Sequence, residues 1–418
     1  MTLVTELELP AFDYTDPSMR GERFHAAMRD LRAGGWLAQG PFGYIVLDRE
    51  AGEFFLRTRA VSFPGMKIAE IFGVSEGPLY EQMKRNILHV NGPDHTRLRS
   101  LVNPALSPRA VERYRPAMRG FLEDLLARAQ AADAEPDDGT LRCEFVEAFA
   151  KPYPSQVIAE VMGAPLQDAP KLHHWSNWIQ RQFDAVSMAT EREGIEQAVE
   201  EFYEYAEALV AARRESPSGD LISKLIAAEE EGDRLTDVEC INLVFNVLAG
   251  GVDTSQSQLA HTIRLLAEHP GQWELLREDP ELAGRAVEEA LRYEPITPFT
   301  ARIVDEEISF RDVTFPEGTI VMVCAFTANR DLEKTAGWEH AKQTEGFDIT
   351  ADRARARPLT FGAGVHYCLG ANLARAELCE ALAFLGSQFS GLKLDGDPEY
   401  ESITGIYGLA GLPVRLQR

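Results

Sequence analysis

The strongest chemical signal in the sequence is the stretch Phe361-Gly362-Ala363-Gly364-Val365-His366-Tyr367-Cys368-Leu369-Gly370. Its glycines let the backbone approach a flat ligand closely. A helical pattern begins directly after Cys368, so we expect the sulfur at a helix N-terminus, where free N–H groups and the helix dipole favour thiolate over thiol. A lone cysteine beside a glycine turn is more often a buried structural residue. The other interpretation is a thiolate placed against a planar cofactor, which is how haem iron is held.

This decapeptide resembles the haem-binding loop of the cytochrome P-450 superfamily, especially its bacterial members. Further stretches match in the same order, including Asp220–Leu225, so the resemblance covers the chain from about residue 85 onward. It implies a mainly α-helical fold with small β-sheets, in which haem b lies between a long central helix and the cysteine loop. It implies Cys368 as the thiolate ligand of iron. The same resemblance assigns cofactor binding to the loop residues Phe361, Gly362, Gly364, His366 and Gly370.

Composition and charge narrow the class of protein. The 418 residues are 45% apolar and no clear linker divides them, so we expect a single domain over residues 1–418. The formal net charge of −24 argues against a nucleic-acid partner, because the phosphate backbone would repel it. The five scattered cysteines fit a reducing compartment. The sequence has no signal-like start and no run of roughly 18 apolar residues, so we expect a cytoplasmic protein with no membrane partner.

Helical periodicity runs through most of the chain. It predicts helices at about 107–131, 155–163, 168–187 and 191–214, with an acidic surface loop at Asp133–Gly139. Thr236 with Glu239 forms a capping box, and the apolar run that follows continues to His269-Pro270. This run predicts one buried helix of about nine turns that crosses the domain.

Strand signals are few. The predicted strands are Phe299–Val304, Glu307–Phe310 and Thr319–Cys324, the last two joined through Phe315–Gly318. A final pair is expected near Tyr407 and at 412–416.

The central helix contains Ala249-Gly250-Gly251-Val252-Asp253-Thr254-Ser255. A glycine inside a helix costs about 1 kcal/mol, and consecutive small residues allow a local distortion that opens a groove. The resemblance implies that dioxygen sits in a groove at Gly250 and Gly251, and that Asp253 and Thr254 are the acid–alcohol pair that relays protons to it. The alternative is a kinked core helix in which Thr254 bonds back to a carbonyl one turn earlier.

Glu289 and Arg292 form an ExxR pattern, which on a helix places both side chains on one face. The pattern alone says little, because such pairs are common. The resemblance implies a buried structural pair behind the haem.

Four residues resemble the family's contacts to the haem propionates. His95 and Arg99 lie four apart on a predicted helix, Arg302 lies in a predicted strand, and His366 precedes the thiolate by two residues. Buried carboxylates need charge-assisted partners, for which arginine is well suited. The alternative for each is a solvated surface cation.

The segment Leu332–Gly346 is longer than in most bacterial members of the family. Gly346 stands where a basic residue often precedes the pair Phe347-Asp348. This departure leaves open whether Arg353 or no residue completes the network around the ExxR pair. The extra residues are also placed to alter the surface where an electron donor docks.

Asn246 is spaced by four from Gly250, so we expect it in the substrate pocket near Ala249. There it bonds either a polar group of an otherwise apolar substrate or a neighbouring helix. By resemblance alone, the other pocket walls are the loop 63–72, the helices near 174–188, and the residues Thr297, Phe299, Thr300, Ile406 and Tyr407. The apolar loop suits a small hydrophobic molecule.

The resemblance implies a monooxygenase that inserts one atom of dioxygen into a C–H or C=C bond. The sequence has no Rossmann-type glycine motif, so electrons are expected from a separate ferredoxin served by an NAD(P)H-dependent reductase. Such donors are usually acidic, which predicts a local basic patch of Arg109, Arg113, Arg115 and Arg375. The alternatives are a thiolate-haem peroxygenase or isomerase, and a non-catalytic haem-binding sensor. The intact pair Asp253-Thr254 argues against both.

Overall fold

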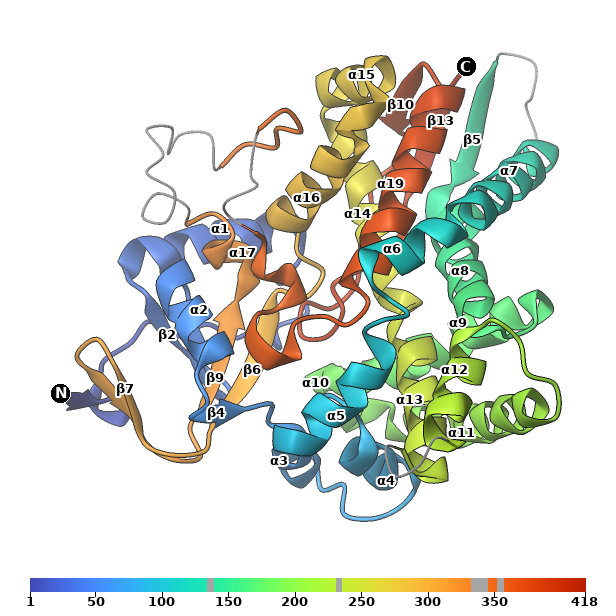
Figure 1. The fold of residues 1–418 in the computed structure, drawn as a ribbon. Coiled ribbons are helices and arrows are strands. Elements are labelled where there is room, and N and C mark those ends of the chain that lie inside the picture. The colour runs from blue at the N-terminus through green and yellow to red at the C-terminus, as the bar shows by residue number, and fades with distance from the viewer. Residues whose placement is uncertain (134–138, 231–234, 332–344, 352–356) are drawn as a thin grey trace.

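The computed structural model describes residues 1–133, 139–230, 235–331, 345–351 and 357–418, which form helices and four small sheets (Figure 1). The helices are α1 (Gly21–Gly34), α2 (Arg49–Arg57), α3 (Gly65–Ile71), α4 (Pro78–Arg85), α5 (Gly92–Val102), α6 (Pro108–Val111), α7 (Arg115–Ala132), α8 (Pro152–Met162), α9 (Ala169–Gln180), α10 (Ala185–Thr190), α11 (Arg192–Glu215), α12 (Leu221–Glu230), α13 (Asp237–Gly250), α14 (Asp253–Glu268), α15 (Pro270–Glu278), α16 (Ala283–Tyr293), α17 (Ala325–Ala328) and α19 (Ala371–Gln388). This arrangement confirms the predicted mainly helical fold with small sheets.

The largest sheet has the order β2-β3-β9-β6-β4. Its strands are β2 (Leu37–Gly40), β3 (Gly43–Val46), β9 (Ile320–Cys324), β6 (Phe299–Val304) and β4 (Val61–Ser62). The smaller sheets are β1 (Thr2–Leu3) with β8 (Val313–Phe315) and β7 (Ile308–Phe310), β10 (Gly391–Leu394) with β13 (Pro413–Gln417) and β5 (Thr140–Glu144), and β11 (Glu399–Tyr400) with β12 (Leu409–Gly411).

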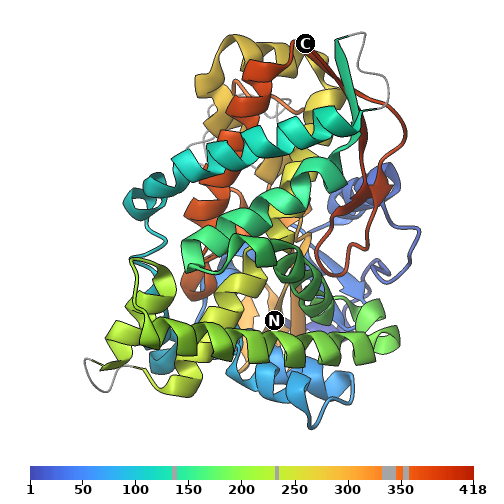
Figure 2. The ribbon, with the colours of Figure 1, turned by 90° about the vertical axis from the view of Figure 1, so that its right-hand side faces the viewer.

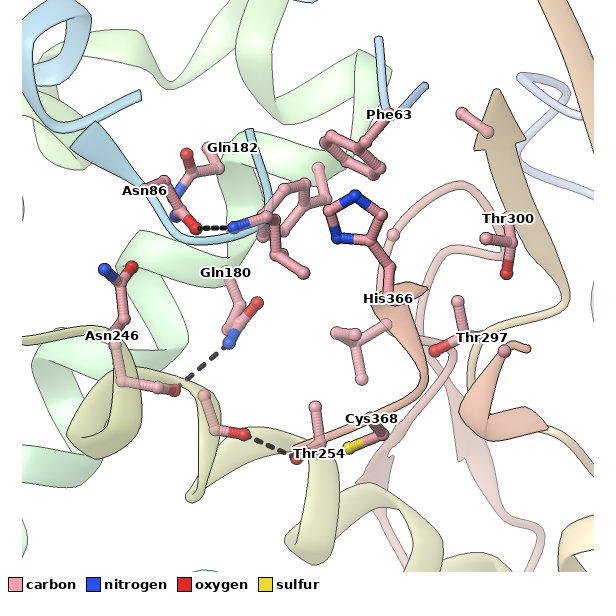
Figure 3. Close-up of a pocket in the computed structure, with 18 of the residues that line it drawn as sticks. Phe63, Asn86, Gln180, Gln182, Asn246, Thr254, Thr297, Thr300, His366 and Cys368 are labelled. Atoms are coloured by element: carbon pink, nitrogen blue, oxygen red, sulfur yellow. Dashed lines mark hydrogen bonds between the residues drawn. The ribbon is translucent and has the colours of Figure 1, made fainter. Parts of the chain in front are cut away.

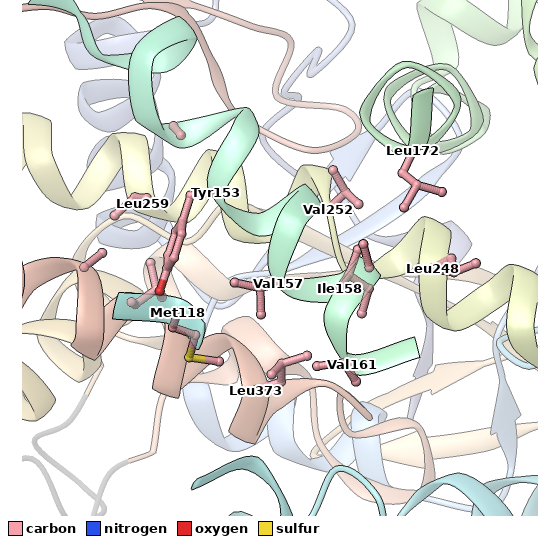
Figure 4. Packing of buried hydrophobic residues seen from close by; sticks show 14 of the residues in the cluster. Met118, Tyr153, Val157, Ile158, Val161, Leu172, Leu248, Val252, Leu259 and Leu373 are labelled. Atoms are coloured by element: carbon pink, nitrogen blue, oxygen red, sulfur yellow. The ribbon is translucent and has the colours of Figure 1, made fainter. Parts of the chain in front are cut away.

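The helices form the larger part of the molecule, and the five-stranded sheet lies beside them, as the blue and orange elements of Figure 1 show. In the turned view of Figure 2, the long α11 crosses the lower part of the helical face, with α7 and α8 above it. The main core lies between α7, α8, α14 and α19 (Figure 4). Its fully buried side chains include Met118, Tyr153, Val157, Ile158, Leu259 and Leu373.

The predicted long central helix is wrong in one respect, because the structure divides it into α13 and α14. The predicted capping box at its start is confirmed: the Glu239 N–H donates to Thr236 Oγ1 at 3.3 Å, and the Thr236 N–H donates to Glu239 Oε2 at 2.8 Å. The break falls at Gly251-Val252, where the Gly251 N–H bonds to Leu248 O, three residues earlier, at 3.4 Å. The tightened turn ends α13, so the expected distortion is large enough to interrupt the helix.

Two other predicted helices are also divided. The helix expected at 107–131 appears as α6, a 3₁₀ turn at Glu112–Tyr114, and α7, which starts afresh at Arg115-Pro116 because proline lacks an N–H to continue a helix. The helix expected at 168–187 ends at Gln180, and α10 begins after Asp184, whose carboxylate accepts from the N–H groups of Val186 and Ser187.

The strand at Phe299–Val304 is confirmed as β6, but two predicted pairings are wrong. The strand expected at Glu307–Phe310 does not join β9, since β8 follows it and pairs with it as a hairpin. The strands near Tyr407 and at 412–416 do not pair with each other either. β12 pairs with β11, while β13 pairs with β10 and β5.

Among the helices in the described part of the chain, none has both the length and the apolar composition of a bilayer-spanning segment. Most of the predicted acidic loop at Asp133–Gly139, most of the segment Leu332–Gly346, and Arg353 lie outside the described residues.

Candidate active site

Cys368 is held just before α19 by a tight backbone path. Its N–H donates to Phe361 O at 2.9 Å, and Gly362 and Gly364 have φ values of 69° and 71°. A Cβ added at Gly364 would lie 2.5 Å from the backbone oxygen of Leu56, so only glycine lets this loop pass α2. The decapeptide therefore places the sulfur at a helix N-terminus, as its pattern predicts.

The Cys368 side chain is exposed to the central cavity, which it lines. Burial raises the pKa of this thiol above its usual value, while the N–H groups of Gly370 and Ala371 and the charges of Arg99 and Arg375 act in the opposite direction. The N–H groups at the helix N-terminus therefore favour thiolate, as predicted, but burial outweighs them in the protein by itself. A thiol that coordinates a metal is deprotonated by that metal.

Two arginines that line the cavity, the buried Arg302 and the partly buried Arg99, lack a carboxylate partner among the described residues. Arg302 is 3% exposed, donates to its neighbour Ala301 O at 2.8 Å, and burial lowers its pKa to about 10. Arg99 donates to Tyr367 O at 2.6 Å, and burial lowers its pKa as well. Both line the cavity. Buried cations without an anion are unfavourable, so this wall requires an anionic ligand.

The two predicted histidines lie together at the same end of the site. The rings of His95 and His366 are 4.2 Å apart, and His366 Nε2 lies 3.0 Å from Asn91 Oδ1. Burial lowers the pKa of His95 to about 4 and that of His366 to about 3, so both are neutral near pH 7. His95 Nε2 and His366 Nδ1 are buried without a hydrogen-bond partner among the described residues. His366 lines the cavity, and His95 packs behind it.

These observations fit haem. Its iron matches the sulfur that opens into the cavity, and its two propionates match the uncompensated arginines and the unpartnered histidine nitrogens. The predicted propionate contacts are thus brought to one place by helix α5, strand β6 and the cysteine loop.

The groove in the central helix opens on the same cavity. A Cβ added at Gly250 would meet nothing within 4 Å, whereas one at Gly251 would lie 2.8 Å from Ile158 Cδ1 of α8. Gly251 is therefore required by helix packing, and Gly250 keeps the wall open. Thr254 lines the cavity, and its Oγ1 donates to Gly250 O at 2.8 Å, which is the back-bond of the alternative interpretation.

Asp253 is buried but does not line the cavity. Asn177 Nδ2 of α9 donates to Asp253 Oδ1 at 3.3 Å. Burial raises the pKa of this carboxyl to about 6. Asp253 and Thr254 therefore lie on different sides of the same helix end, one toward α9 and one toward Cys368 (Figure 3).

Glu289 and Arg292 form a buried pair, each 1% exposed. Arg292 Nε donates to Glu289 Oε2 at 2.7 Å. Main-chain groups extend the network, since Arg292 also donates to Gly346 O at 2.7 Å and the Asp348 N–H donates to Glu289 Oε1 at 3.0 Å. The basic side chain that the family pattern expects at position 346 is thus replaced by a backbone carbonyl.

The cavity has a volume of about 450 Å³ and mostly apolar walls (Figure 3). The predicted wall residues that line it include Phe63, Ile68, Ile71, Phe72, Asn246, Ala249, Thr297, Phe299, Thr300 and Ile406. Tyr407 does not line it, and this prediction is wrong. Its ring is fully buried, its hydroxyl accepts from the Gly21 N–H at 2.8 Å, and Ile406 faces the cavity in its place.

Two of the four arginines in the predicted basic patch are paired with glutamates. Arg115 is paired with Glu112 and Glu380, and Arg375 is paired with Glu288. Arg109 and Arg113 are exposed on α6 and the turn after it.

Several polar residues of the site were missed from sequence. The cavity wall includes Gln82, Asn86, Gln180, Gln182 and Gln258, which come from segments far apart in the chain. Glu377 of α19 does not line the cavity, but it is 1% exposed and burial raises its pKa to about 8. In sequence, each looks like a polar position on an amphipathic helix, so no local signal marks it.

Comparison with known proteins agrees with this geometry. The family model described as cytochrome P450 matches residues 73–403. Luteothin monooxygenase of Streptomyces thioluteus is 31% identical over 412 residues, covering 98% of this chain and 96% of that protein. Mycinamicin IV hydroxylase/epoxidase of Micromonospora griseorubida is 34% identical and covers 76% of each chain. The crystal structure of CalO2 superposes with a TM-score of 0.86 at 30% identity, covering 98% of this chain and 99% of that one. The chain therefore belongs to the cytochrome P450 family, whose members bind haem b through a cysteine thiolate, and it is an oxidoreductase of that family.

Proposed function

We propose that this protein hydroxylates or epoxidises a small hydrophobic molecule with dioxygen, using electrons from a separate ferredoxin and its NAD(P)H-dependent reductase. The observation that carries the proposal is that Cys368 and Thr254 line one mostly apolar cavity whose wall also holds uncompensated Arg302. The name of mycinamicin IV hydroxylase/epoxidase, a relative, supports this reaction class. A cytoplasmic location, predicted from cysteine usage, is part of the proposal.

Haem bound in this cavity supplies the oxidising chemistry, and the protein provides its binding and its surroundings. The Cys368 sulfur would ligate the iron. Arg99 and Arg302 would neutralise the propionates, with His95 and His366 lying beside them.

Asp253 and Thr254, neighbours in the first turn of α14, deliver protons from different faces of that helix, since Asp253 faces α9 and Thr254 lines the cavity. Asn177 joins Asp253 to Arg181, which pairs with the half-exposed Glu191, so the carboxyl is connected to the surface through polar groups. A carboxyl with a pKa of about 6 both gains and loses a proton near neutral pH. The Thr254 hydroxyl, on the cavity side, passes the proton to the reacting oxygen.

Electron delivery is proposed at the exposed arginines Arg109 and Arg113. Arg115 and Arg375, the other two arginines of the predicted basic patch, add little to this positive charge because each is paired with a glutamate. A small cationic area still steers an acidic donor in a protein of net charge −24.

The first test is the absorption spectrum of the reduced protein with carbon monoxide. A strongly red-shifted Soret band is expected from a thiolate–iron complex, and a histidine-type band would contradict the assignment of Cys368. The second test is turnover with ferredoxin, reductase and NAD(P)H, in which cofactor oxidation and product formation should match. Product formed from peroxide alone would favour a peroxygenase, and haem binding without any turnover would favour a sensor.

A further inference from the structure

Helix α9 presents a polar face to the central helix. The side chains of this face are spaced by three and four residues, so they lie on one side of α9; they are His173, Ser176, Asn177 and Gln180. Each is hydrogen-bonded to the last turn of α13 or the first turn of α14. Helices inside a protein usually pack through an apolar face, so polar contacts gathered at the break point to a specific role.

Two of these side chains donate to the same carbonyl. Ser176 Oγ donates to Ala249 O at 2.6 Å, and Gln180 Nε2 donates to the same oxygen at 3.1 Å. Ser176 is 0% exposed and does not line the cavity, whereas Gln180 reaches the oxygen from the cavity wall (Figure 3). A carbonyl oxygen has two lone pairs, so the two donors from α9 match its full capacity.

The Ala249 carbonyl belongs to the last turn of α13, four residues before Asp253. In an uninterrupted helix the Asp253 N–H would donate to Ala249 O. The two donors from α9 compete with that bond. Side chains that insert into the ladder of helical hydrogen bonds kink or break a helix, so these donors favour the observed break.

The neighbouring carbonyls also have partners that a regular α-helix does not use. Gly250 O accepts from Thr254 Oγ1 at 2.8 Å. Leu248 O accepts from the Gly251 N–H, three residues later, at 3.4 Å. Both of these partners belong to the central helix itself, whereas those of Ala249 O come from α9. Helix α9 is therefore the external element that acts on the break.

The bond made by Ser176 is not the one that a buried helical hydroxyl usually makes. Ser155 of α8 donates to Lys151 O at 2.9 Å, and Thr262 of α14 donates to Gln258 O at 2.6 Å, in each case four residues earlier in the same helix. This local bond is typical of serine and threonine within helices. Ser176 donates to another helix instead, so local preference does not explain its contact.

We propose that Ser176 and Gln180 are positioning residues, which hold Ala249 O and thereby keep the central helix interrupted. The interruption leaves the groove at Gly250 open and holds the Thr254 hydroxyl on the cavity side. The inference rests on the proposed function, because the groove and the hydroxyl serve the reaction proposed above.

The test is amide hydrogen exchange of the haem-loaded protein, with the Asp253 amide resolved by mass spectrometry. In the double variant Ser176→Ala with Gln180→Met, Ala249 O loses both side-chain donors. The Asp253 N–H should then bind this oxygen and exchange about tenfold more slowly than in the unaltered protein. Each single variant should show a smaller change in the same direction. A mere loosening of α9 would make the amide exchange faster, so the direction of the change separates the two roles.

Ser155→Ala is the matched control. It also removes a buried hydroxyl from a helix of the core, but that hydroxyl bonds within α8, so the exchange of the Asp253 amide should not change. Turnover is measured with Ser176→Ala, because Ser176 does not line the cavity. With ferredoxin, reductase and a substrate that the unaltered enzyme converts, this variant should release more hydrogen peroxide and less product per NAD(P)H oxidised.

Unchanged or faster exchange of the Asp253 amide in the double variant would overturn the proposal. So would equal slowing in Ser155→Ala, or slower exchange in Ser176→Ala with an undiminished yield of product. A failure of the unaltered protein to turn over would contradict the proposed monooxygenase reaction and would leave the exchange result standing, so the two failures are distinguishable.

Discussion

Arg292 meets Glu289 with two parallel hydrogen bonds, from Nε to Oε2 and from NH2 to Oε1, each 2.7 Å long, in a part of the protein where both side chains are 1% exposed. The same two side chains bind the backbone at Gly346 and Asp348. This pair therefore joins α16 to the chain segment that precedes the cysteine loop.

Glu289→Ala should destabilise the folded protein by about 3–5 kcal/mol, because it leaves a buried guanidinium without its counter-charge. Chemical denaturation of the haem-loaded protein measures the effect. Glu81→Ala is the control, since the pair of Glu81 with Arg85 is largely exposed and should contribute less than about 1 kcal/mol. Equal effects of the two substitutions would contradict the structural role.

Arg302→Met should have opposite effects on the two forms of the protein. Without haem, the variant should be at least as stable as the unaltered protein, because a buried cation with a pKa lowered to about 10 is removed. With haem, a propionate loses its partner, so haem should transfer to apomyoglobin faster. Melting of the haem-free form and the transfer rate measure the two effects, and a less stable haem-free variant would contradict the proposed role.

Asp253→Asn should make stability less dependent on pH. Burial raises the folded-state pKa of this carboxyl from its usual 3.8 to about 6, so its contribution to stability is fully present below about pH 3 and is lost as pH rises through 6. The variant should gain about 2 kcal/mol relative to the unaltered protein between pH 4 and pH 7. Denaturation at each pH measures this change, and parallel profiles would contradict the shifted pKa.

The same variant should turn over at least about 10²-fold more slowly if Asp253 supplies protons. NAD(P)H oxidation uncoupled from product formation is the expected signature. Asn177→Ala should show a smaller loss of the same kind, since it only removes the 3.3 Å contact to the carboxylate.

Alanine substitutions at Gly250 and Gly251 should have different effects on stability and on product formation. Gly251→Ala places a methyl group 2.8 Å from Ile158 and should destabilise the protein by about 1 kcal/mol or more. Gly250→Ala meets open space and should stabilise the helix by up to about 1 kcal/mol, while its methyl group narrows the groove and lowers coupling. Thermal melting with a product assay separates the two, and equal behaviour would show that the groove has no role.

Charge reversal at Arg109 and Arg113 should slow reduction by an acidic ferredoxin at low salt, and the difference should shrink at high salt. Stopped-flow reduction over a range of ionic strength measures this dependence. The matched comparison is Arg119→Glu on α7, where the arginine is already paired with Glu380. An unchanged salt dependence in the double reversal would contradict the proposed docking area.

Predictions from the sequence were correct where residues within a few positions of one another determine the local structure. The cysteine loop, the capping box at Thr236 and the strand at Phe299–Val304 all depend on spacing within a few positions. Tyr407 was misplaced because the chain near it turns, so that Ile406 and not its neighbour faces the cavity.

The remainder depended on contacts between distant segments. Gly251 packs against Ile158, and the Gly346 carbonyl accepts a hydrogen bond from Arg292. The residues of each pair lie far apart in the sequence, so no local pattern predicts either contact. Gln82, Asn86 and Gln258 come from segments that meet only in the folded chain, so no local pattern predicts that they line one cavity.

The buried, uncompensated arginines also connect this protein to the supply of its cofactor in the cell. A chain folded around Arg99 and Arg302 without an anion lacks the ligand that would shift its equilibrium toward the native state. We expect such chains to open more often in a haem-starved cell and to be removed by proteases, so that the amount of enzyme would follow the amount of haem. The protein would therefore accumulate only when haem is available to bind it.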